Sequence, residues 1–385
     1  MTAVHTSVVV RGMGLSCALG EGTDACVARL RAGPVVPAIL DLAGFEERIS
    51  MPFYSIPGTA DLFDPMRADA LLPRVAREAI SSAGLTSQEI VRLPIFIGTS
   101  AFSIRRSEIK PAIPTQIRDA ALELPLIGYE QIGHTLQRAL DCRGEVFGFN
   151  TACTSAANAV MTAARMIRLG WHQHALVVGL ELASLPTLAG FSALQLLADS
   201  LKPFDLNRRG IVLGEAVGAV ILSAADPRAP GIHIAAGASN IDSYRVTTAH
   251  PDGRTIAALQ ETVLAQASAD HREIRGIKTH GTASPMNDTS EAAGIRRVFD
   301  HMPPVCALKP YVGHTLGACG VTELVLMASA LGAGFFPATT GFETIDPALM
   351  ISPVRDERVA ELGFYLLNYF GFGGHNTALL LEKRT

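Results

Sequence analysis

The chain has 385 residues, of which 48% are hydrophobic and 18% are charged, and its formal net charge is −4. This apolar composition excludes a disordered chain, and the small negative charge gives no reason to expect a nucleic acid or an anionic membrane as partner. The length allows about two or three domain-sized units.

Short apolar runs alternate with helical patterns along the whole chain. Strands are predicted at 7–10, 95–98, 146–149, 175–179, 217–222, 232–235, 274–279, 305–308 and 377–381. Helices are predicted at 155–168, 255–269, 290–299 and 317–331. Many of the strands are continuously apolar, which is typical of sheets covered on both faces. The alternation predicts an α/β protein.

A small, proline-containing break at 224–231 divides the chain into 1–226 and 227–385. The two parts have comparable predicted elements, but no residue-level repetition is visible between them. The irregular segment 103–130 carries Pro111, Pro114 and Pro125. It is interpreted either as a loop or cap near an active site or as an exposed connection.

The cysteines and the N-terminal sequence bear on the compartment of the protein. The six cysteines stand at 17, 26, 142, 153, 306 and 319, without a CxxC pair or zinc-finger spacing, so no metal site is predicted. Scattered cysteines favour a reduced, intracellular protein. We see neither a secretory signal nor an apolar run long enough to span a membrane. The expected location is the cytoplasm.

Cys153 stands at a predicted strand-to-helix turn, in the run Asn-Thr-Ala-Cys-Thr-Ser-Ala-Ala from 150 to 157. Free backbone N–H groups and the helix dipole favour an anion at such a place. We therefore expect a lowered thiol pKa and a thiolate nucleophile at neutral pH. Most free cysteines are simply small buried residues, and the other five are interpreted in this way.

Three further segments carry polar groups or glycines in compact patterns. Residues 278–291 read Lys-Thr-His-Gly-Thr-Ala-Ser-Pro-Met-Asn-Asp-Thr-Ser-Glu, and residues 309–320 read Lys-Pro-Tyr-Val-Gly-His-Thr-Leu-Gly-Ala-Cys-Gly. Residues 368–376 read Asn-Tyr-Phe-Gly-Phe-Gly-Gly-His-Asn. A single histidine, lysine or glycine turn is most often structural. The combination of these segments with Cys153 favours a catalytic site.

Together these segments resemble the β-ketoacyl-[acyl carrier protein] synthases, which are the elongating, decarboxylating ketosynthases. The corresponding motifs of that family read Thr-Ala-Cys-Ser-Ser/Thr-Ala, His-Gly-Thr-Gly-Thr-Pro-x-x-Asp-x-x-Glu, Lys-Ser-x-x-Gly-His-Thr-x-Gly-Ala-Ala-Gly and Asn-Ser-Phe-Gly-Phe-Gly-Gly-Thr-Asn. Residues 202–216 also resemble a family segment, and 11–14 with 30–33 fit the opening strand and first helix. The early Gly12-Met13-Gly14 is not a dinucleotide fingerprint, because Cys17 stands where the third glycine is required.

The resemblance implies a thiolase-like α/β fold, in which two similar halves form a five-layer α-β-α-β-α core. It implies an acyltransferase that joins an acyl group held on Cys153 to malonyl carrier protein, with loss of carbon dioxide. His280 and His314 would stabilise the enolate, Lys309 would hold the network, and the N–H groups of Cys153 and Phe372 would form the oxyanion hole. Supporting roles are implied for Thr282, Ser284, Asp288, Glu291, Glu323, Gly371 and Gly373.

The resemblance also implies partners and leaves alternatives open. No metal or organic cofactor is expected, because the acyl carrier protein supplies the phosphopantetheine arm. A homodimer, or a heterodimer with a related ketosynthase subunit, is expected. The predicted carrier-docking residues are Arg105, Arg106, Lys202, Arg208 and Arg209, each of which can equally be a solvated charge. The alternatives are a chain-length-determining partner subunit and a thiolase-like synthase that uses coenzyme A thioesters.

Some positions depart from the family patterns. Ala283 replaces a glycine, Ser284 a threonine and His375 a threonine, and Ala216, Asn287 and Arg209 also differ. No catalytic group is lost. These departures favour a divergent member from a polyketide, polyene or fatty-acid pathway over the housekeeping enzyme.

Overall fold

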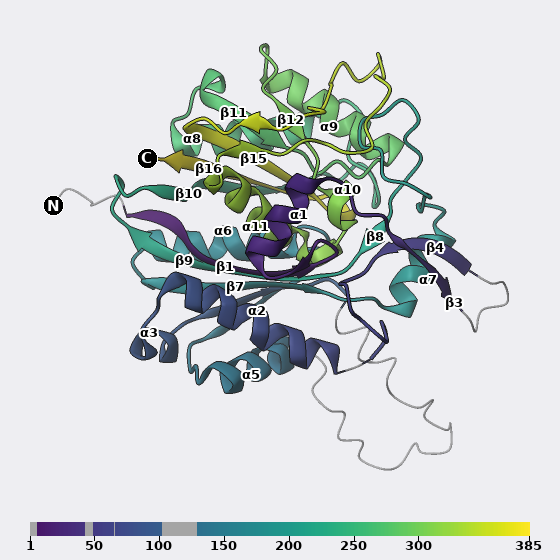
Figure 1. Cartoon of the computed structure of the whole chain (residues 1–385). Helices are drawn as coiled ribbons and strands as arrows, with labels where there is room; N and C mark the ends of the chain where they lie inside the picture. Colours follow the sequence, from purple (N-terminus) through teal and green to yellow (C-terminus); the bar gives the residue numbers. More distant parts are fainter. Residues whose placement is uncertain (1–5, 43–48, 65, 102–128) are drawn as a thin grey trace.

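The protein is a stack of two β-sheets and three layers of helices (Figure 1). The computed structural model describes residues 6–42, 49–64, 66–101 and 129–385. The predicted docking residues Arg105 and Arg106 therefore lie outside the described residues. The same holds for the irregular segment 103–130, apart from its last two residues.

The two main sheets have the same strand order and the same pattern of directions. The first runs β6-β5-β7-β9-β1 and the second runs β12-β11-β15-β16-β10. In each sheet the first three strands are parallel and the last two join antiparallel. The single pair Val9 and His233 links β1 to β10. The strands of the two sheets are β1 (Ser7–Cys17), β5 (Ile95–Gly98), β6 (Val146–Phe149), β7 (His174–Glu181), β9 (Ala216–Ala225), β10 (Gly231–Ile241), β11 (Ile274–Lys278), β12 (Val305–Cys306), β15 (Gly363–Phe370) and β16 (His375–Arg384).

Helices cover both outer faces and fill the space between the sheets (Figure 1). Helices α2 and α5 pack on the first sheet, α8 and α9 lie over the second, and α6 and α11 pack between the two. The helices are α1 (Thr23–Ala32), α2 (Arg67–Ala83), α3 (Ser87–Val91), α5 (Tyr129–Leu140), α6 (Ser155–Arg168), α7 (Leu185–Ala193), α8 (Arg254–Ala267), α9 (Pro285–Val298), α10 (Lys309–Val312) and α11 (Cys319–Gly332). Short 3₁₀ turns are η1 (His271–Glu273), η2 (Leu316–Ala318) and η3 (Phe372–Gly374).

Two small sheets complete the fold. One has the order β3 (Ala38–Leu42), β4 (Ile49–Tyr54) and β8 (Leu213–Gly214), and the other pairs β13 (Phe335–Phe336) with β14 (Arg358–Val359). The short strand β2 (Gly20–Glu21) extends the edge of β1. Within the described part of the chain, no helix is long and apolar enough to cross a membrane.

Glycines bring elements together where the fold needs a close approach. A Cβ on Gly12 would lie 2.1 Å from the carbonyl oxygen of Ala79 in α2, so the early Gly-x-Gly serves to seat α2 on β1. A Cβ on Gly320 would lie 2.0 Å from the backbone nitrogen of Ala157. Helices α6 and α11 therefore touch backbone to backbone, which brings together the loops that precede them.

Most predicted elements are confirmed, with shifted ends. The helix at 155–168 and the strands at 95–98 and 146–149 match α6, β5 and β6. The predicted strand 305–308 ends at Cys306, because Leu308 already begins α10 as its N-cap. The predicted boundary after residue 226 falls in the connection between β9 and β10, and the division into domains stays a prediction.

Candidate active site

The nucleophile turn joins β6 to α6, and its backbone is constrained. Ala152 has a φ of 51°, in the left-handed region that residues with a Cβ rarely adopt. The Thr154 hydroxyl donates to the carbonyl oxygen of Thr151 at 2.7 Å, and the Cys319 thiol donates to the carbonyl oxygen of Cys153 at 2.9 Å. These bonds hold Cys153 at the start of α6, where it is only 5% exposed.

The thiol of Cys153 is not the low-pKa group that its position suggests. Burial raises its pKa to about 12. The charge of Lys309 and the backbone N–H groups of Phe372 and Cys153 lower the pKa by less than burial raises it. The expectation of a thiolate at neutral pH was therefore wrong. The cause is that the turn lies inside the protein, so loss of water outweighs the backbone dipoles.

His314 is the direct partner of the nucleophile. Its Nε2 lies 3.1 Å from the Cys153 sulfur. Backbone bonds to β8 and the segment before it fix the position of the histidine, because its N–H donates to Val212 and its carbonyl accepts from Gly214. Its Nδ1 is buried and has no hydrogen-bond partner among the described residues. No neighbour therefore fixes the tautomer, and Nε2 can accept or donate a proton.

His280 is held by the ammonium group of Lys309. The Lys309 Nζ donates to the His280 carbonyl oxygen at 2.6 Å and lies 3.3 Å from His280 Nδ1. An ammonium has only donors, so Nδ1 must be the unprotonated nitrogen and Nε2 must carry the proton. The rings of His280 and His314 are 5.3 Å apart and nearly perpendicular. The pKa of each imidazole lies well below its usual value, because of burial and then the positive charge of Lys309, so both are neutral near pH 7.

Two buried carboxylates anchor this network. Glu323 of α11 accepts from Lys309 at 2.7 Å, which stabilises the lysine cation against the cost of burial. Glu291 of α9 accepts from the backbone N–H groups of His280 and Gly281 at 2.8 and 3.0 Å, and from the Asn368 side chain. Burial raises the pKa of Glu291.

The remaining supporting residues lie around the histidine loop. Thr282 borders the site, and its hydroxyl oxygen accepts a hydrogen bond from the Ser284 N–H. Ser284 is the N-cap residue of α9. Asp288 accepts from the backbone N–H of Phe204 at 2.7 Å. Burial raises the pKa of Asp288 to about 7. Asp288 therefore links the segment 202–216 to the histidine loop and does not face the thiol.

The glycine turn closes the site over the nucleophile. A Cβ on Gly371 would lie 3.1 Å from the Cys153 backbone nitrogen, so glycine allows the two segments to touch. Gly373 has a φ of 79° and donates its N–H to Val246. Between them, Phe372 stacks on Phe191 of α7 at 5.6 Å.

Cys153 and Phe372 border two cavities. The first is a narrow space of about 20 Å³, lined by His280, His314 and Thr282. The second, of about 270 Å³, is mostly apolar and is lined by Phe191, Leu194 and Leu316, among others. Phe372 stands between a polar space at the imidazoles and an apolar space behind the sulfur.

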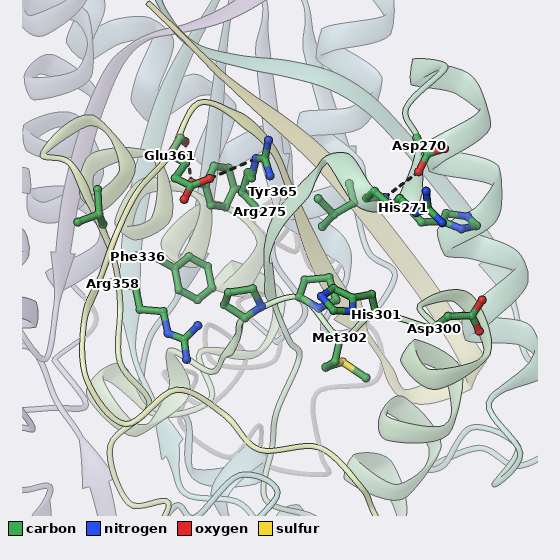
Figure 2. Close-up of a pocket in the computed structure, with 15 residues that line it drawn as sticks. Asp270, His271, Arg275, Asp300, His301, Met302, Phe336, Arg358, Glu361 and Tyr365 are labelled. Carbon is green, nitrogen blue, oxygen red and sulfur yellow. Dashed lines mark hydrogen bonds and ion pairs between the residues drawn. The ribbon is translucent and has the colours of Figure 1, made fainter.

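A larger cavity of about 1270 Å³ lies away from these groups (Figure 2). It is bordered by the loops that precede β11 and β12, and by Arg275 of β11, which pairs with Glu361 in the segment before β15. The catalytic loops leave the opposite ends of those strands. This cavity contains no nucleophile, so its size does not mark the site of chemistry.

The predicted docking residues differ in their availability. Arg209 is exposed. Lys202 forms an ion pair with the exposed Glu343 at 2.8 Å. Arg208 is paired with Asp346 at 2.6 Å, with only 9% of its side chain exposed. The structure therefore argues against Arg208 as a docking residue, because its guanidinium holds two loops together.

Sequence reasoning missed Glu181 and Lys278. Glu181, at the end of β7, accepts from the backbone N–H groups of Ser100, Ala101 and Gly317. It thereby ties the end of β5 to the turn before α11. Lys278 donates to the carbonyl oxygen of Asn368 and is described further below. Neither residue stands in a quoted family motif, and a charged residue at the end of an apolar strand was the only available signal.

A buried thiol that contacts one imidazole and shares a cavity with a second, at the meeting point of two matching α/β halves, defines a condensing enzyme of the thiolase type. Two family models match: "Beta-ketoacyl synthase, N-terminal domain" at residues 53–227 and "Beta-ketoacyl synthase, C-terminal domain" at 232–343. The chain belongs to the β-ketoacyl synthase family, and it is an acyltransferase-type condensing enzyme.

Named relatives cover almost the whole chain. The tetracenomycin polyketide synthase ketoacyl synthase alpha subunit of Streptomyces glaucescens is 30% identical, over 98% of this chain and 97% of the relative. Nodulation protein E of Rhizobium meliloti is 27% identical, over 98% and 99%. The solved structure "The ishigamide ketosynthase/chain length factor" has a TM-score of 0.82 at 24% identity, over 99% of this chain and 100% of that chain, and shows the shared fold.

Proposed function

We propose that the protein is a β-ketoacyl-ACP synthase, which condenses an acyl group held on Cys153 with malonyl carrier protein. The observation that carries the proposal is the contact of His314 Nε2 with the Cys153 sulfur, beside a His280 whose tautomer is set by Lys309. The reaction produces a β-ketoacyl carrier protein, carbon dioxide and a free carrier thiol.

In the first half-reaction, the Cys153 thiol passes its proton to His314 Nε2 as the sulfur attacks the acyl thioester. The backbone N–H groups of Cys153 and Phe372, which already point at the sulfur, support the oxyanion as it forms. Collapse of the intermediate breaks the bond to the carrier sulfur, and His314 returns the proton to that leaving thiolate. The acyl chain then extends into the apolar cavity beside Phe191.

In the second half-reaction, the malonyl group occupies the polar space between the imidazoles. His280 donates from Nε2, as its tautomer requires. His314 donates from Nε2 after its proton moves from Nδ1 to Nε2, a tautomer change that no hydrogen bond at Nδ1 opposes. Carbon dioxide leaves as its bonding electrons form the enolate, which the two N–H groups stabilise. The enolate carbon attacks the acyl-cysteine carbonyl, and the bond to the Cys153 sulfur breaks. The thiolate that leaves takes up one proton from solvent through His314 Nε2, which restores the resting thiol. No metal or organic cofactor takes part in the proposed reaction.

The partners follow from this chemistry. An acyl carrier protein delivers both thioesters on its phosphopantetheine arm, and Lys202 and Arg209 are the described candidates for docking it. We further propose that the protein works in the cytoplasm as a dimer, with itself or with a related ketosynthase subunit. The relatives that match almost the whole chain include a polyketide synthase subunit and a nodulation protein, whereas 3-oxoacyl-ACP synthases 2 match about 60% of it. We propose a specialised pathway on the basis of this coverage.

Intact-protein mass spectrometry tests the proposal most directly. The purified chain is mixed with carrier proteins that bear acyl groups of different length, with a Cys153→Ala variant alongside. A Cys142→Ala variant is the matched control, because Cys142 is 4% exposed and lies away from the histidines. We expect an acyl-sized mass gain in the wild type and in the control, and none in Cys153→Ala.

The same experiment separates the alternatives. A mass gain from coenzyme A thioesters but not from carrier-bound acyl groups would favour the coenzyme A-dependent synthase. No gain from any donor, with or without a partner subunit, would favour the chain-length-determining subunit and contradict the proposal.

A further inference from the structure

Lys278 is a second buried lysine beside the catalytic histidines. It is the last residue of β11, two positions before His280, and it is 0% exposed. Its ammonium pairs with one oxygen of Glu323 and donates to the carbonyl oxygen of Asn368 at 2.7 Å. Lys309 takes the other oxygen of Glu323. A single carboxylate therefore holds two buried ammonium groups from two different strand ends.

In this arrangement two lysine side chains share the one carboxylate of Glu323. If Lys309 alone faced Glu323, the pair would be neutral. Burial and the charge of Lys309 lower the pKa of Lys278, and its contact with Glu323 opposes that shift. The other nearby carboxylate, Glu291, accepts from backbone N–H groups and not from the lysines. Burial of an uncompensated charge costs several kcal/mol as an order of magnitude, so a structural role alone gives no reason for a second ammonium here.

Tyr369 supplies an independent observation. The Lys278 Nζ lies 3.6 Å from the centre of the Tyr369 ring, which is a cation–π contact. The quoted family pattern has a serine at the position of Tyr369. The Tyr369 hydroxyl is buried and has no hydrogen-bond partner among the described residues. The contact that Tyr369 makes with Lys278 is therefore made by the aromatic ring and not by the hydroxyl. The aromatic face stabilises the buried ammonium group.

We propose that Lys278 is a positioning residue for the imidazole pair: it fixes Glu323 together with Lys309 and adds a second buried positive charge behind His280 and His314. The proposal rests on the proposed condensing function and adds a residue to its machinery. Lys278 does not border either cavity at the sulfur, so it acts through Glu323 and through its electric field.

The charges that face the imidazoles come from several elements, and their balance gives the sign of the effect. Lys278 of β11 and Lys309 of α10 both lower the pKa of each imidazole, after burial. The other titratable groups around the cluster are Glu323 and Cys319 of α11, Glu291 of α9, Tyr369 of β15, the nucleophile Cys153, and Glu181 of β7, which acts on Cys153. Removal of Lys278 leaves Glu323 and Lys309 as a neutral pair, so the imidazoles should protonate at a higher pH.

The test is a Lys278→Met variant, which keeps the length of the side chain and removes its charge. Lys383→Met is the matched control, because Lys383 donates to Ala360 at the end of β16 away from the site. The decarboxylation rate of malonyl carrier protein is measured against pH. We expect the acidic limb of the Lys278→Met profile to move up by about one pH unit, and the control to follow the wild type.

A second readout does not depend on activity. In protein labelled with ¹³C-histidine, His280 and His314 are assigned with single His→Asn variants and titrated by NMR. We expect their midpoints to rise in Lys278→Met, and the midpoint of the remote His172 to stay. If the wild type does not decarboxylate malonyl carrier protein, the proposed function fails, and the NMR titration still decides the role of Lys278.

Two results would overturn the proposal. One is a uniform loss of rate at every pH with unchanged histidine midpoints, which a purely structural lysine would give. The other is an unchanged profile. If Lys278→Met does not fold, Lys278→Gln provides a neutral side chain that still hydrogen-bonds to Glu323, and the same shift is expected. Lys278→Arg keeps the charge and should keep the wild-type limb.

Discussion

Ala283 is one of the residues of the site with a strained backbone. It replaces a glycine of the family pattern, it is 0% exposed, and its φ is 61°. A residue with a Cβ pays about 1–2 kcal/mol for this left-handed backbone, whereas glycine does not. We predict that Ala283→Gly raises the free energy of unfolding by about 1 kcal/mol, measured by urea denaturation.

Ala163 provides the control for this prediction. It is also 0% exposed, but it lies inside α6, where the helical backbone suits alanine. Ala163→Gly should lower stability by about 1 kcal/mol. Equal losses in the two variants would show that residue 283 is limited by packing and not by its backbone.

The Cys153 thiol gives a second residue-level prediction. Because burial raises its pKa to about 12, the thiolate fraction should grow about tenfold for each pH unit between pH 7 and 9. Alkylation of the Cys153 peptide by iodoacetamide, followed by mass spectrometry, should accelerate accordingly. A rate that is already constant above pH 7 would mean that the thiolate is stabilised, as the sequence alone suggested.

At this scale, predictability follows how local the signal is. Cys153, His280, Lys309 and His314 were predictable because each lies within a contiguous motif. The thiol pKa was not, because it depends on water excluded by segments distant in the sequence. Lys278 was not recognised either, since its partner Glu323 lies far along the chain.

At the scale of elements, α7 borders the cavity that we propose for the acyl chain. Its Phe191 borders the 270 Å³ space and stacks on Phe372. We predict that Phe191→Ala enlarges the cavity and shifts acylation toward longer chains, by about tenfold in the ratio of long-chain to short-chain rates. The acyl mass gain on Cys153 over a series of carrier-bound chain lengths measures this ratio.

Leu194 is the control for Phe191, because it borders the same cavity but is 55% exposed. Leu194→Ala should leave the ratio nearly unchanged. An unchanged ratio in Phe191→Ala would mean that the acyl chain does not occupy this cavity.

A helix whose apolar residues recur with helical spacing was predicted from the sequence. Two helices that contain proline, α2 and α7, were missed. α6 reads as an uninterrupted helical run and was located to the residue. α2 was missed, since Pro73 inside it is ordinarily a helix breaker. α7, with Pro186 and Gly190, resembles a connection, but Pro186 stands in the first turn of the helix, where a proline is tolerated.

At the scale of the whole molecule, the two halves repeat their topology without repeating their residues. The order β6-β5-β7-β9-β1 matches β12-β11-β15-β16-β10, pair by pair. Cys153 follows β6, and Lys309 with His314 follows the matching β12. Such a duplication is invisible in a single sequence, because an apolar strand tolerates many residue choices as long as burial is kept. The site lies where the two repeats meet.

The same topology predicts how the proposed dimer would form. β6 is the outer strand of the first sheet in the described residues. The carbonyl oxygens of Glu145 and Phe149 accept from β5, so the alternating backbone groups of Val146 and Gly148 face the open edge. An unpaired edge of this kind is suited to pairing with a second chain. We predict that Val146→Pro removes an outward N–H and shifts the protein from dimer to monomer.

Light scattering after size-exclusion chromatography measures the shift. Val146→Thr keeps the N–H group and a branched side chain, so it should remain dimeric, which separates loss of the hydrogen bond from loss of packing. Proline is tolerated on an edge strand when its nitrogen faces away from the neighbouring strand. The folded monomer should therefore persist, with circular dichroism close to that of the wild type. A Val146→Pro variant that stays dimeric would place the interface on another surface. In that case β6 does not pair with a second chain.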